Sequence, residues 1–464
     1  MAAERDRWAL AACLTLAVLY LLLFRPAYSV MGGGDFALYL AHAQAIAEWR
    51  PYAATGFVYN PANAIMSPAA YPPGVPLLLA PVIAAIGLDF TAIKLVMLAS
   101  LLAMLWCLHR LALPSLGPRW SAVLVLAAGL SPAILMRRDA IGSDIIFAAW
   151  CYLALLGARG RPALLAVGVA MALLTRSIGL VLVAALALDL FFRPGPARRR
   201  LLPALIAGTV VALVATLWLR VDNATYAGYF ARLSATGLIR HAIDAGQAYA
   251  FAVVELFGLS FGRIANLPVL VALIALIAAG LFARLRRGPD ATTLFVVLYA
   301  AALLAYPVHQ EPTRYALPIL PLLLLVAFEF LQPRLGRHGP AIALVGLAIL
   351  YLPYYATHNP RAQAPLTTES PEFRDLVAAI QATPPDTLFL ARNPRLFALF
   401  AARPTVTWGE TPTPDDFADT LARFRPAYLI EEKWRYPDEA AKLPVAFENA
   451  AYRLRSIPAA APGR

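Results

Sequence analysis

The sequence has few charged residues and few cysteines, and each shortage excludes a class of protein. Of its 464 residues 14% are charged and 61% are hydrophobic, a balance that excludes a soluble globular protein. Its three cysteines, Cys13, Cys107 and Cys151, all lie in apolar stretches, so no disulfide framework is expected. Apolar runs of membrane-crossing length recur over residues 8–355, which indicates a polytopic membrane protein.

Three familiar catalytic signatures are also missing. The chain has no phosphate-binding P-loop, no His-Glu-x-x-His pair for zinc and no Gly-x-Ser-x-Gly nucleophile turn. Nucleotide chemistry of the soluble type therefore has no support in the sequence.

The net charge of +12 lies entirely in residues 1–355, and the remaining residues 356–464 are neutral. The excess arginines stand in short loops between apolar runs. These loops contain Arg5 and Arg7, Arg110 and Arg119, Arg159 and Arg161, residues 193–200, Arg284, Arg286 and Arg287, and Arg334 and Arg337. Short basic loops mark the cytoplasmic side of a membrane protein, so we expect membrane lipids, and no nucleic acid, as partners.

If every basic loop is cytoplasmic, an even number of spans must separate each from the next. Residues 72–87 are then an interfacial or re-entrant element, and residues 251–259 belong to an outer loop. Residues 163–192 form two short spans that turn at Arg176, since a central arginine would cost about 2.5 to 3.5 kcal/mol. About 11 spans follow from this rule. They are 8–24, 91–109, 120–136, 145–158, 162–174, 178–192, 201–219, 266–283, 292–307, 315–331 and 340–355.

The expected fold is an all-α polytopic membrane module, residues 1–355, followed by a small α/β domain, residues 356–464. The outer loop, residues 25–90, is expected to hold interfacial helices. An odd number of spans places the C-terminal domain outside and the N-terminus in the cytoplasm. Within that domain the pattern predicts helices near 371–380, 396–402 and 414–424 and strands near 387–391, 405–408 and 427–431.

Polar side chains gather at the outer helix ends of this topology. They are Asp35, Tyr71, Arg137, Arg138, Asp139, Asp144, Arg176, His309, Glu311 and Arg314. Arginines of such a group could hold a lipid phosphate while a carboxylate deprotonates an acceptor.

Several of these residues also have structural interpretations. Asp35 and Asp144 could cap the helices that follow them, and Arg137 and Arg138 could extend to lipid headgroups. A turn between two short spans is an unusual place for a purely structural charge, so Arg176 is harder to explain in this way.

Metal binding has little support. His309 has no partner at metal-ligand spacing, and Glu311 could simply pair with Arg314. Asp35 and Asp144 would make a sparse ligand set for magnesium, although a donor phosphate could complete it. We favour no metal and no other cofactor.

Over nearly its whole length the chain resembles the GT-C superfamily of membrane glycosyltransferases, which includes protein O-mannosyltransferases and aminoarabinose transferases. Five features carry the resemblance. They are Asp35 after the first helix with Tyr39 one turn on, Tyr71-Pro72-Pro73-Gly74, Ser131-Pro132 before a loop ending in Ser143-Asp144, Thr175-Arg176-Ser177-Ile178-Gly179, and Arg314-Tyr315-Ala316-Leu317-Pro318. The mannosyltransferases have a second acid where this chain has Phe36, which argues against protein mannosylation.

The resemblance implies inverting transfer of one sugar from a polyprenyl-phosphate donor to a hydroxyl of a lipid or glycan acceptor on the outer face. Asp35 would be the general base and Asp144 a second acid. Arg176 and Arg314, with Arg137, Arg138 and His309 as further candidates, would neutralise the departing phosphate. Tyr39, Tyr71, Asp139 and Glu311 would line the site.

Two other functions remain open from the sequence. The first is a transporter or flippase of lipid-linked sugars, and the second is a glycan polymerase or ligase that uses lipid diphosphates. The abundance of arginine over lysine suggests a GC-rich bacterial genome, hence a bacterial inner membrane with a periplasmic C-terminal domain. The sugar and the acceptor are not encoded in any recognisable pattern.

Overall fold

The computed structural model describes residues 2–25, 28, 34–63, 66, 69–193, 195–219, 235–259, 263–306, 311–362, 367–409, 413–432 and 438–458. The chain folds into two compact units. Unit 1 comprises Met1–Phe24, Lys94–Trp218 and Tyr229–Ala362, and unit 2 comprises Arg25–Ile93, Leu219–Gly228 and Gln363–Arg464.

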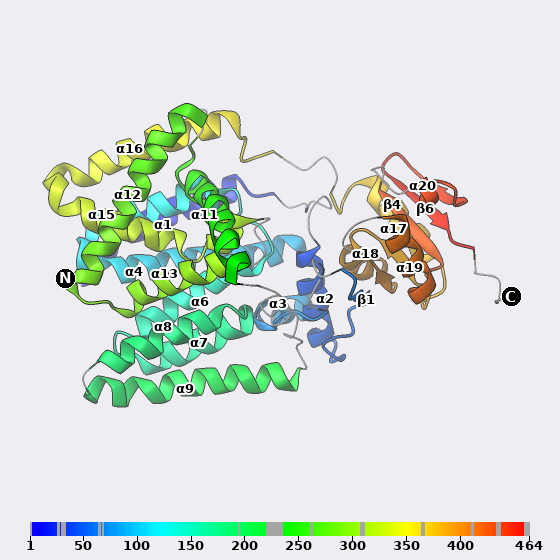
Figure 1. Cartoon of the computed structure of the whole chain (residues 1–464), viewed down its shortest axis with the longest axis horizontal. Coiled ribbons are helices and arrows are strands. Elements are labelled where there is room, and N and C mark those ends of the chain that lie inside the picture. The colour runs from blue at the N-terminus through cyan, green and yellow to red at the C-terminus, as the bar shows by residue number, and fades with distance from the viewer. Residues whose placement is uncertain are drawn as a thin grey trace. The chain divides into compact units, whose positions relative to one another are not determined.

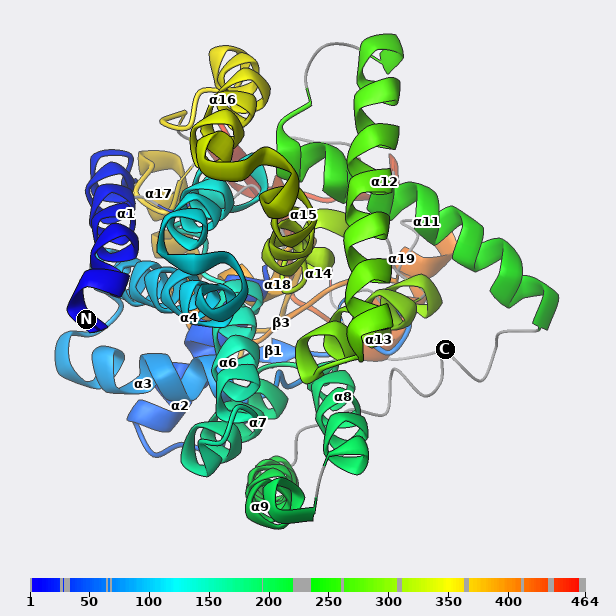
Figure 2. The same ribbon diagram turned by 90° about the vertical axis from the view of Figure 1, so that its left-hand side faces the viewer.

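Unit 1 is a bundle of apolar helices (Figure 1). It contains α1 (Ala2–Leu22), α4 (Phe90–Leu130), α5 (Pro132–Leu135), α6 (Ser143–Gly157), α7 (Pro162–Thr175), α8 (Gly179–Phe192), α9 (Gly195–Trp218), α11 (Ala235–Phe257), α12 (Arg263–Arg287), α13 (Ala291–Ala305), α14 (Pro312–Ala316), α15 (Leu320–Leu335), the 3-10 turn η2 (Gly336–His338) and α16 (Gly339–Thr357). Figure 2 shows α6, α7 and α8 roughly end-on, and the chain reverses direction from each to the next. Each interval in which the sequence predicts a span contains helix, although non-helical residues interrupt 120–136 at Ser131 and 315–331 at residues 317–319.

The bundle is that of a membrane protein. Among the described residues, four helical stretches are long and apolar enough to cross a membrane: Phe90–Leu130, Gly195–Trp218, Asn266–Arg287 and Leu320–Thr357. Shorter apolar helices, α6, α7, α8 and α13, complete the bundle. Apolar side chains are exposed on the outside of the bundle, as on α9, where Val210, Leu213 and Leu217 are exposed.

Two predicted reversals are present. Gly117 adopts φ 71° inside α4, between Pro114 and Pro118, which interrupt regular helix. His109 Nδ1 lies 3.0 Å from Ser121 Oγ, whereas a straight helix would separate these residues by about 18 Å. The chain therefore turns back at this basic loop. The second reversal is at Arg176, where α7 ends in extended backbone and α8 starts three residues later.

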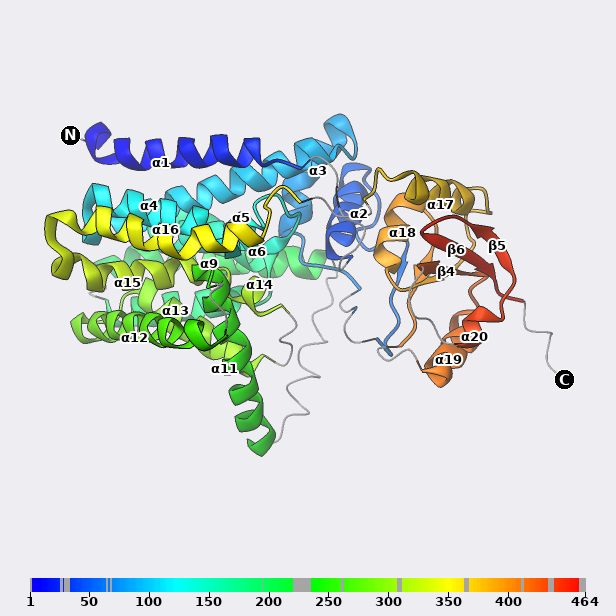
Figure 3. The same ribbon diagram turned by 90° about the horizontal axis from the view of Figure 1, so that it is seen from above.

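One segment is more regular than expected. Residues 251–259 were assigned to an outer loop, and residues 251–257 form the last turns of α11, which is not among the described helices that are long and apolar enough to cross a membrane. Figure 3 shows that α11 lies across the other helices of the bundle. The requirement for an even number of spans between basic loops tests only whether a segment crosses the membrane. It cannot distinguish an irregular loop from a helix that lies crosswise.

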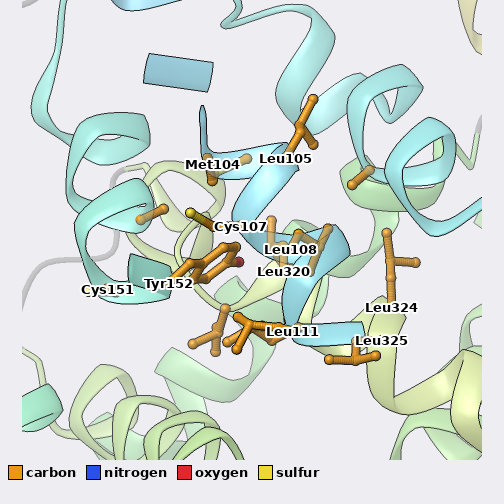
Figure 4. Packing of buried hydrophobic residues seen from close by; sticks show 14 of the residues in the cluster. Met104, Leu105, Cys107, Leu108, Leu111, Cys151, Tyr152, Leu320, Leu324 and Leu325 are labelled. Carbon is orange, nitrogen blue, oxygen red and sulfur yellow. The ribbon is translucent and has the colours of Figure 1, made fainter. Parts of the chain in front are cut away.

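The core of unit 1 forms where α4, α6 and α15 meet (Figure 4). Met104, Leu108 and Leu111 of α4 share one face because they recur at helical spacing, and all are buried. Tyr152 of α6 is fully buried among them, and its hydroxyl donates to the carbonyl of Pro318 at 2.9 Å. This contact fixes α6 against the segment that follows Arg314.

Contacts between the basic loops hold them together at one end of unit 1. Arg159 Nη2 donates to the Leu111 carbonyl at 2.8 Å, and Arg193 Nη1 donates to the Ala158 carbonyl. The guanidinium of Arg284 pairs with Asp290 at 3.1 Å and with Glu329 at 3.4 Å. At the opposite end α7 and α13 finish, and α6, α8 and α14 begin. Asp144, Arg176 and Arg314 belong to that opposite end.

Unit 2 is an α/β unit around a six-stranded sheet. Its elements are α2 (Asp35–Ala47), β1 (Phe57–Val58), α3 (Gly74–Ile86), α17 (Pro371–Gln381), β2 (Phe389–Ala391), α18 (Pro394–Ala401), β3 (Thr405–Val406), α19 (Pro414–Phe424), β4 (Tyr428–Glu432), α20 (Asp438–Ala441), β5 (Val445–Glu448) and β6 (Tyr452–Ser456). The strand order is β1-β3-β2-β4-β6-β5, with β6 antiparallel to both of its neighbours and the other pairings parallel.

Helices cover both faces of this sheet (Figure 3). In β2 and β4, Leu390 and Leu429 pack with Phe417 of α19 on one face. On the other face Phe373 of α17 packs against Tyr452 of β6. Side chains alternate across a strand, so apolar residues on both faces require a layer of helices on each side.

The strand β1 was not anticipated from the sequence. Phe57 pairs with Thr405, and Asn60 Nδ2 donates to the carbonyl of Thr407 at 2.8 Å. Asn63 Nδ2 donates to the carbonyl of Trp408 at 3.0 Å. The loop after the first helix is therefore joined to the C-terminal sheet, through a pairing of two residues that is too short to leave a periodic signal.

Candidate functional site

Asp144 bridges two arginines at the end of unit 1 opposite the basic loops. Arg314 Nε donates to Asp144 Oδ2 at 2.8 Å, and Arg176 pairs with Oδ1 through Nη1. Arg176 Nη1 also lies 3.0 Å from Ser143 Oγ. The Asp144 side chain is 11% exposed, so two cations share one largely buried carboxylate.

Local structure directs all three side chains to this point. Helix α6 begins after Gly142, which places Asp144 in its first turn and not at the capping position. Arg176 follows α7 in extended backbone, and Arg314 lies in the short helix α14 that starts at Pro312. Each residue is thus at a helix end, as the sequence predicts.

Two further residues complete this group, which we call the arginine cluster: Asp144, Arg176, Glu311, Arg314 and Tyr315. Glu311 Oε2 accepts from Arg314 Nη1 at 2.8 Å, and the Tyr315 ring lies 5.8 Å from the Arg176 guanidinium. Two carboxylates balance two guanidinium groups. The arginine side chains remain 19% and 22% exposed, so an anion can reach them.

The neighbouring predicted residues have other partners. Arg137 pairs with Glu255 of α11 at 2.6 Å and is 30% exposed. Arg138 is 1% exposed and donates to the carbonyls of Leu135, Leu23 and Pro360. Asp139 is buried, and His309 lies outside the described residues.

Unit 2 contains a second group around Asp35, which we call the aspartate cluster: Asp35, Tyr39, His42, Tyr71 and Arg395. Asp35 is the first residue of α2 and its side chain is 28% exposed. Its Oδ1 accepts hydrogen bonds from the Tyr71 hydroxyl at 2.6 Å and from Arg395 Nη1 at 2.9 Å. The capping position is held by Gly34, so the carboxylate points to side chains of other segments.

Tyr71 is fixed through its backbone as well. Its N–H donates to His42 Nε2 at 3.2 Å, and its carbonyl accepts from the Tyr52 hydroxyl at 2.7 Å. His42 Nδ1 lies 2.8 Å from the Tyr52 carbonyl, so the imidazole is neutral with its proton on Nδ1. Burial lowers the pKa of His42 to about 4, which agrees with that form. Burial also raises the pKa of Tyr71, so its hydroxyl remains a donor.

Sequence analysis missed Arg395. This residue is 2% exposed and comes from α18, 360 residues after Asp35. The available signal was a cation in the first turn of an otherwise apolar helix, where the helix dipole disfavours positive charge. Such a residue needs an anionic partner, but the sequence does not say which one.

The remaining predicted side chain, Tyr39, stacks near Tyr71 with ring centroids 4.8 Å apart. Among the residues that the structure describes, no three His, Cys, Asp or Glu side chains are grouped as a metal site would require. Asp35 and Asp144 belong to different units, and each has its own arginine partners.

Solved membrane glycosyltransferases have similar folds. ArnT from Cupriavidus metallidurans, bound to undecaprenyl phosphate, gives a TM-score of 0.62 at 13% identity over 97% of this chain and 98% of that one. The Archaeoglobus fulgidus oligosaccharyltransferase, in complex with Zn and sulfate, gives 0.57 at 13% identity over 91% and 68%. The arabinofuranosyltransferase AftD from Mycobacteria gives 0.50 at 18% identity over 92% and 35%.

These likenesses concern the fold. No protein-family model matches the sequence, and no curated protein matches it. The similarity to ArnT extends over nearly the full length of both chains, so it includes both compact units. The resemblance expected from the sequence is thereby confirmed for the architecture.

Proposed function

We propose that this chain, which has the fold of the GT-C membrane glycosyltransferases, transfers one sugar from a polyprenyl-phosphate donor to a hydroxyl acceptor with inversion. The acceptor would be a lipid or a glycan at the outer face of a bacterial inner membrane. About 11 spans would place the aspartate cluster and the C-terminal sheet in the periplasm.

The observation that carries this proposal is the arginine cluster. Two partly exposed guanidinium groups at a helix-bundle end suit a lipid-linked phosphate, since a guanidinium fork matches phosphate oxygens. A phosphate esterified to a polyprenyl chain is an anion that remains at the membrane surface. Arg176 and Arg314 would bind it, and Arg137 would supply further positive charge.

The chemical step assigns a role to Asp35. Its carboxylate would accept the acceptor's proton while the acceptor oxygen attacks the anomeric carbon. The bond between that carbon and the phosphate oxygen would break, and Arg176 and Arg314 would stabilise the charge on the departing phosphate. We propose that the site uses no metal and that Tyr39 and Tyr71 line it.

The other predicted residues take more limited roles. Asp144 and Glu311 would orient the arginines, because their carboxylates already hold both guanidinium groups. Arg138 would be structural, since it donates to carbonyls inside unit 1. His309 lies outside the described residues, so its binding of phosphate stays a prediction from the sequence. The position of Asp139 beside the site also stays a prediction.

Transfer can be tested with purified protein in lipid nanodiscs. A panel of undecaprenyl-phosphate monosaccharides is supplied with envelope lipid and glycan extracts, and mass spectrometry follows released undecaprenyl phosphate and new glycosides. Asp35→Asn should abolish transfer without loss of undecaprenyl phosphate binding. Asp386→Asn, an exposed acid of the same unit, is the matched control and should keep full activity.

Three outcomes would contradict the proposal. Full transfer by Asp35→Asn would exclude the general-base role. Translocation of a labelled lipid-linked sugar without transfer would favour a flippase. Turnover only with lipid diphosphate donors would favour a polymerase or ligase.

A further inference from the structure

We propose that Arg395 is a positioning residue that holds the Asp35 carboxylate charged and oriented for proton abstraction. This inference rests on the proposed function of Asp35 and adds a residue from the C-terminal segment to the same site. The geometry of the aspartate cluster supports it.

A single guanidinium nitrogen organises that cluster. Arg395 Nη1 donates to Asp35 Oδ1 at 2.9 Å and also to the Tyr71 hydroxyl, which itself donates to Asp35 Oδ1 at 2.6 Å. The three groups therefore form a closed triangle of hydrogen bonds. The carboxylate cannot rotate without breaking two of them.

Arg395 is itself held in place. It is 2% exposed, and Nη2 donates to the Met66 carbonyl. Its guanidinium lies 5.1 Å from the Phe57 ring centroid and 4.9 Å from that of Tyr71. Contacts with both rings and with a carbonyl leave the planar group one orientation.

The backbone at Gly34 permits this approach of α18 to α2. A Cβ at Gly34 would lie 2.2 Å from Asn393 Oδ1 and 3.2 Å from Arg395 Cβ. The start of α18 therefore lies close to the backbone that precedes Asp35.

Among the described members of the aspartate cluster and on α3, no side chain other than Arg395 carries a positive charge. His42 is neutral, Tyr39 and Tyr71 are phenols, and α3, which packs against α2, has no charged residue. A nearby cation favours the charged form of a carboxyl group. Without Arg395, Asp35 would protonate at higher pH and would rotate more freely.

The test uses the full-length protein in nanodiscs and needs no substrate. A water-soluble carbodiimide modifies protonated carboxyl groups, and peptide mass spectrometry measures modification of Asp35 as a function of pH. In Arg395→Gln the midpoint, which is the pH at which half of Asp35 is modified, should rise by about 1 pH unit or more, because the opposite charge is lost. Arg395→Lys, which keeps a charge but not the fork, should show a smaller rise.

The second measurement is the steady-state kinetics of sugar transfer, with a donor that the wild-type protein uses. Arg395→Gln should lower kcat by about 10-fold or more, with KM within twofold of the wild-type value. The acid limb of its pH–rate profile should shift to higher pH. Arg403→Gln is the matched control, since Arg403 lies in the same unit and donates to the carbonyls of Thr383, Gln381 and Ala402 and not, among the described residues, to the aspartate cluster. It should change neither measurement.

The outcomes separate the two proposals. An unchanged Asp35 midpoint in folded Arg395→Gln overturns the positioning role, and so does unchanged kcat. If Arg395→Gln fails to insert, an Arg395→Lys profile identical to wild type overturns it. A shifted midpoint in a protein that transfers no sugar supports the control of Asp35 by Arg395 and refutes the enzyme function alone.

Discussion

Arg314 donates through Nε to Oδ2 of Asp144, 2.8 Å away, although 170 residues separate them in the chain. The pair joins the first turn of α6 to α14 and leaves the other carboxylate oxygen for Arg176. One carboxylate thus holds two guanidinium groups at the same point. Under the proposed function, a donor phosphate would meet arginines that are already oriented.

Asp144→Asn should reduce sugar transfer by about 100-fold, because the two guanidinium groups lose their shared anchor and misalignment of a binding group is costly. Undecaprenyl phosphate should still bind, since neither arginine is removed. Transfer by mass spectrometry and binding in nanodiscs measure the two effects. Glu48→Gln, whose pair with Arg50 is exposed, is the control, and transfer within twofold of wild type by Asp144→Asn would refute the anchoring role.

Arg314→Lys should weaken undecaprenyl phosphate binding by about 10-fold, because lysine offers a point charge in place of a two-pronged donor. Arg314 uses two nitrogens for Asp144 and Glu311, an arrangement that one ammonium group cannot reproduce. Competition against a fluorescent lipid phosphate measures the affinity. Arg334→Lys, at the end of unit 1 where the basic loops lie, should bind undecaprenyl phosphate with the affinity of the wild type. Equal affinities for both variants would remove Arg314 from the phosphate site.

Arg138→Gln should lower thermal stability more than activity per folded molecule. Its guanidinium donates to three backbone carbonyls while 1% exposed, and a hydrogen bond to a charged group contributes about 1.5 to 3 kcal/mol. A shift of the thermal unfolding midpoint in detergent measures the loss. Arg137→Gln should shift it less, because Arg137 is 30% exposed. Weakened phosphate binding by Arg138→Gln without destabilisation would instead support the role expected from the sequence.

His42 should make unit 2 less stable in acid. Burial depresses the pKa of His42 from 6.5 to about 4, so between these values the unfolded chain binds a proton that the folded chain does not. Stability is complete above pH 6.5 and falls as pH decreases toward 4, by about 3 kcal/mol in total. Protection of unit 2 amides in hydrogen exchange, followed against pH, measures this decline.

A matched pair of variants checks the assignment to His42. His42→Gln should flatten the dependence of unit 2 protection on pH, although its overall protection will be lower. His358→Gln, at an exposed histidine that follows α16, should leave the dependence intact. An unchanged pH dependence in His42→Gln would assign the acid sensitivity to other groups.

The sequence predicted the helices of unit 1 well because long apolar runs and arginine placement are local signals. The turn at Arg176 followed from the energetic cost of placing arginine inside a bilayer, and the reversal near Gly117 followed from the short basic loop with Arg110 and Arg119. The same reasoning identified Asp144, Arg176 and Arg314 as outer residues, and the structure brings their side chains together. It did not predict that α11 is a helix, because counting the spans between basic loops carries no information on the conformation of a segment that does not cross.

What the sequence by itself determined is therefore the position of most apolar helices of unit 1, the basic loops between them and the residue types available for chemistry. Only the tertiary structure decided that Arg395 contacts Asp35 and that Phe57 pairs with Thr405. A contact between distant segments depends on how whole elements pack, and the packing free energy is spread over many residues. No local pattern around Asp35 or Arg395 contains that information.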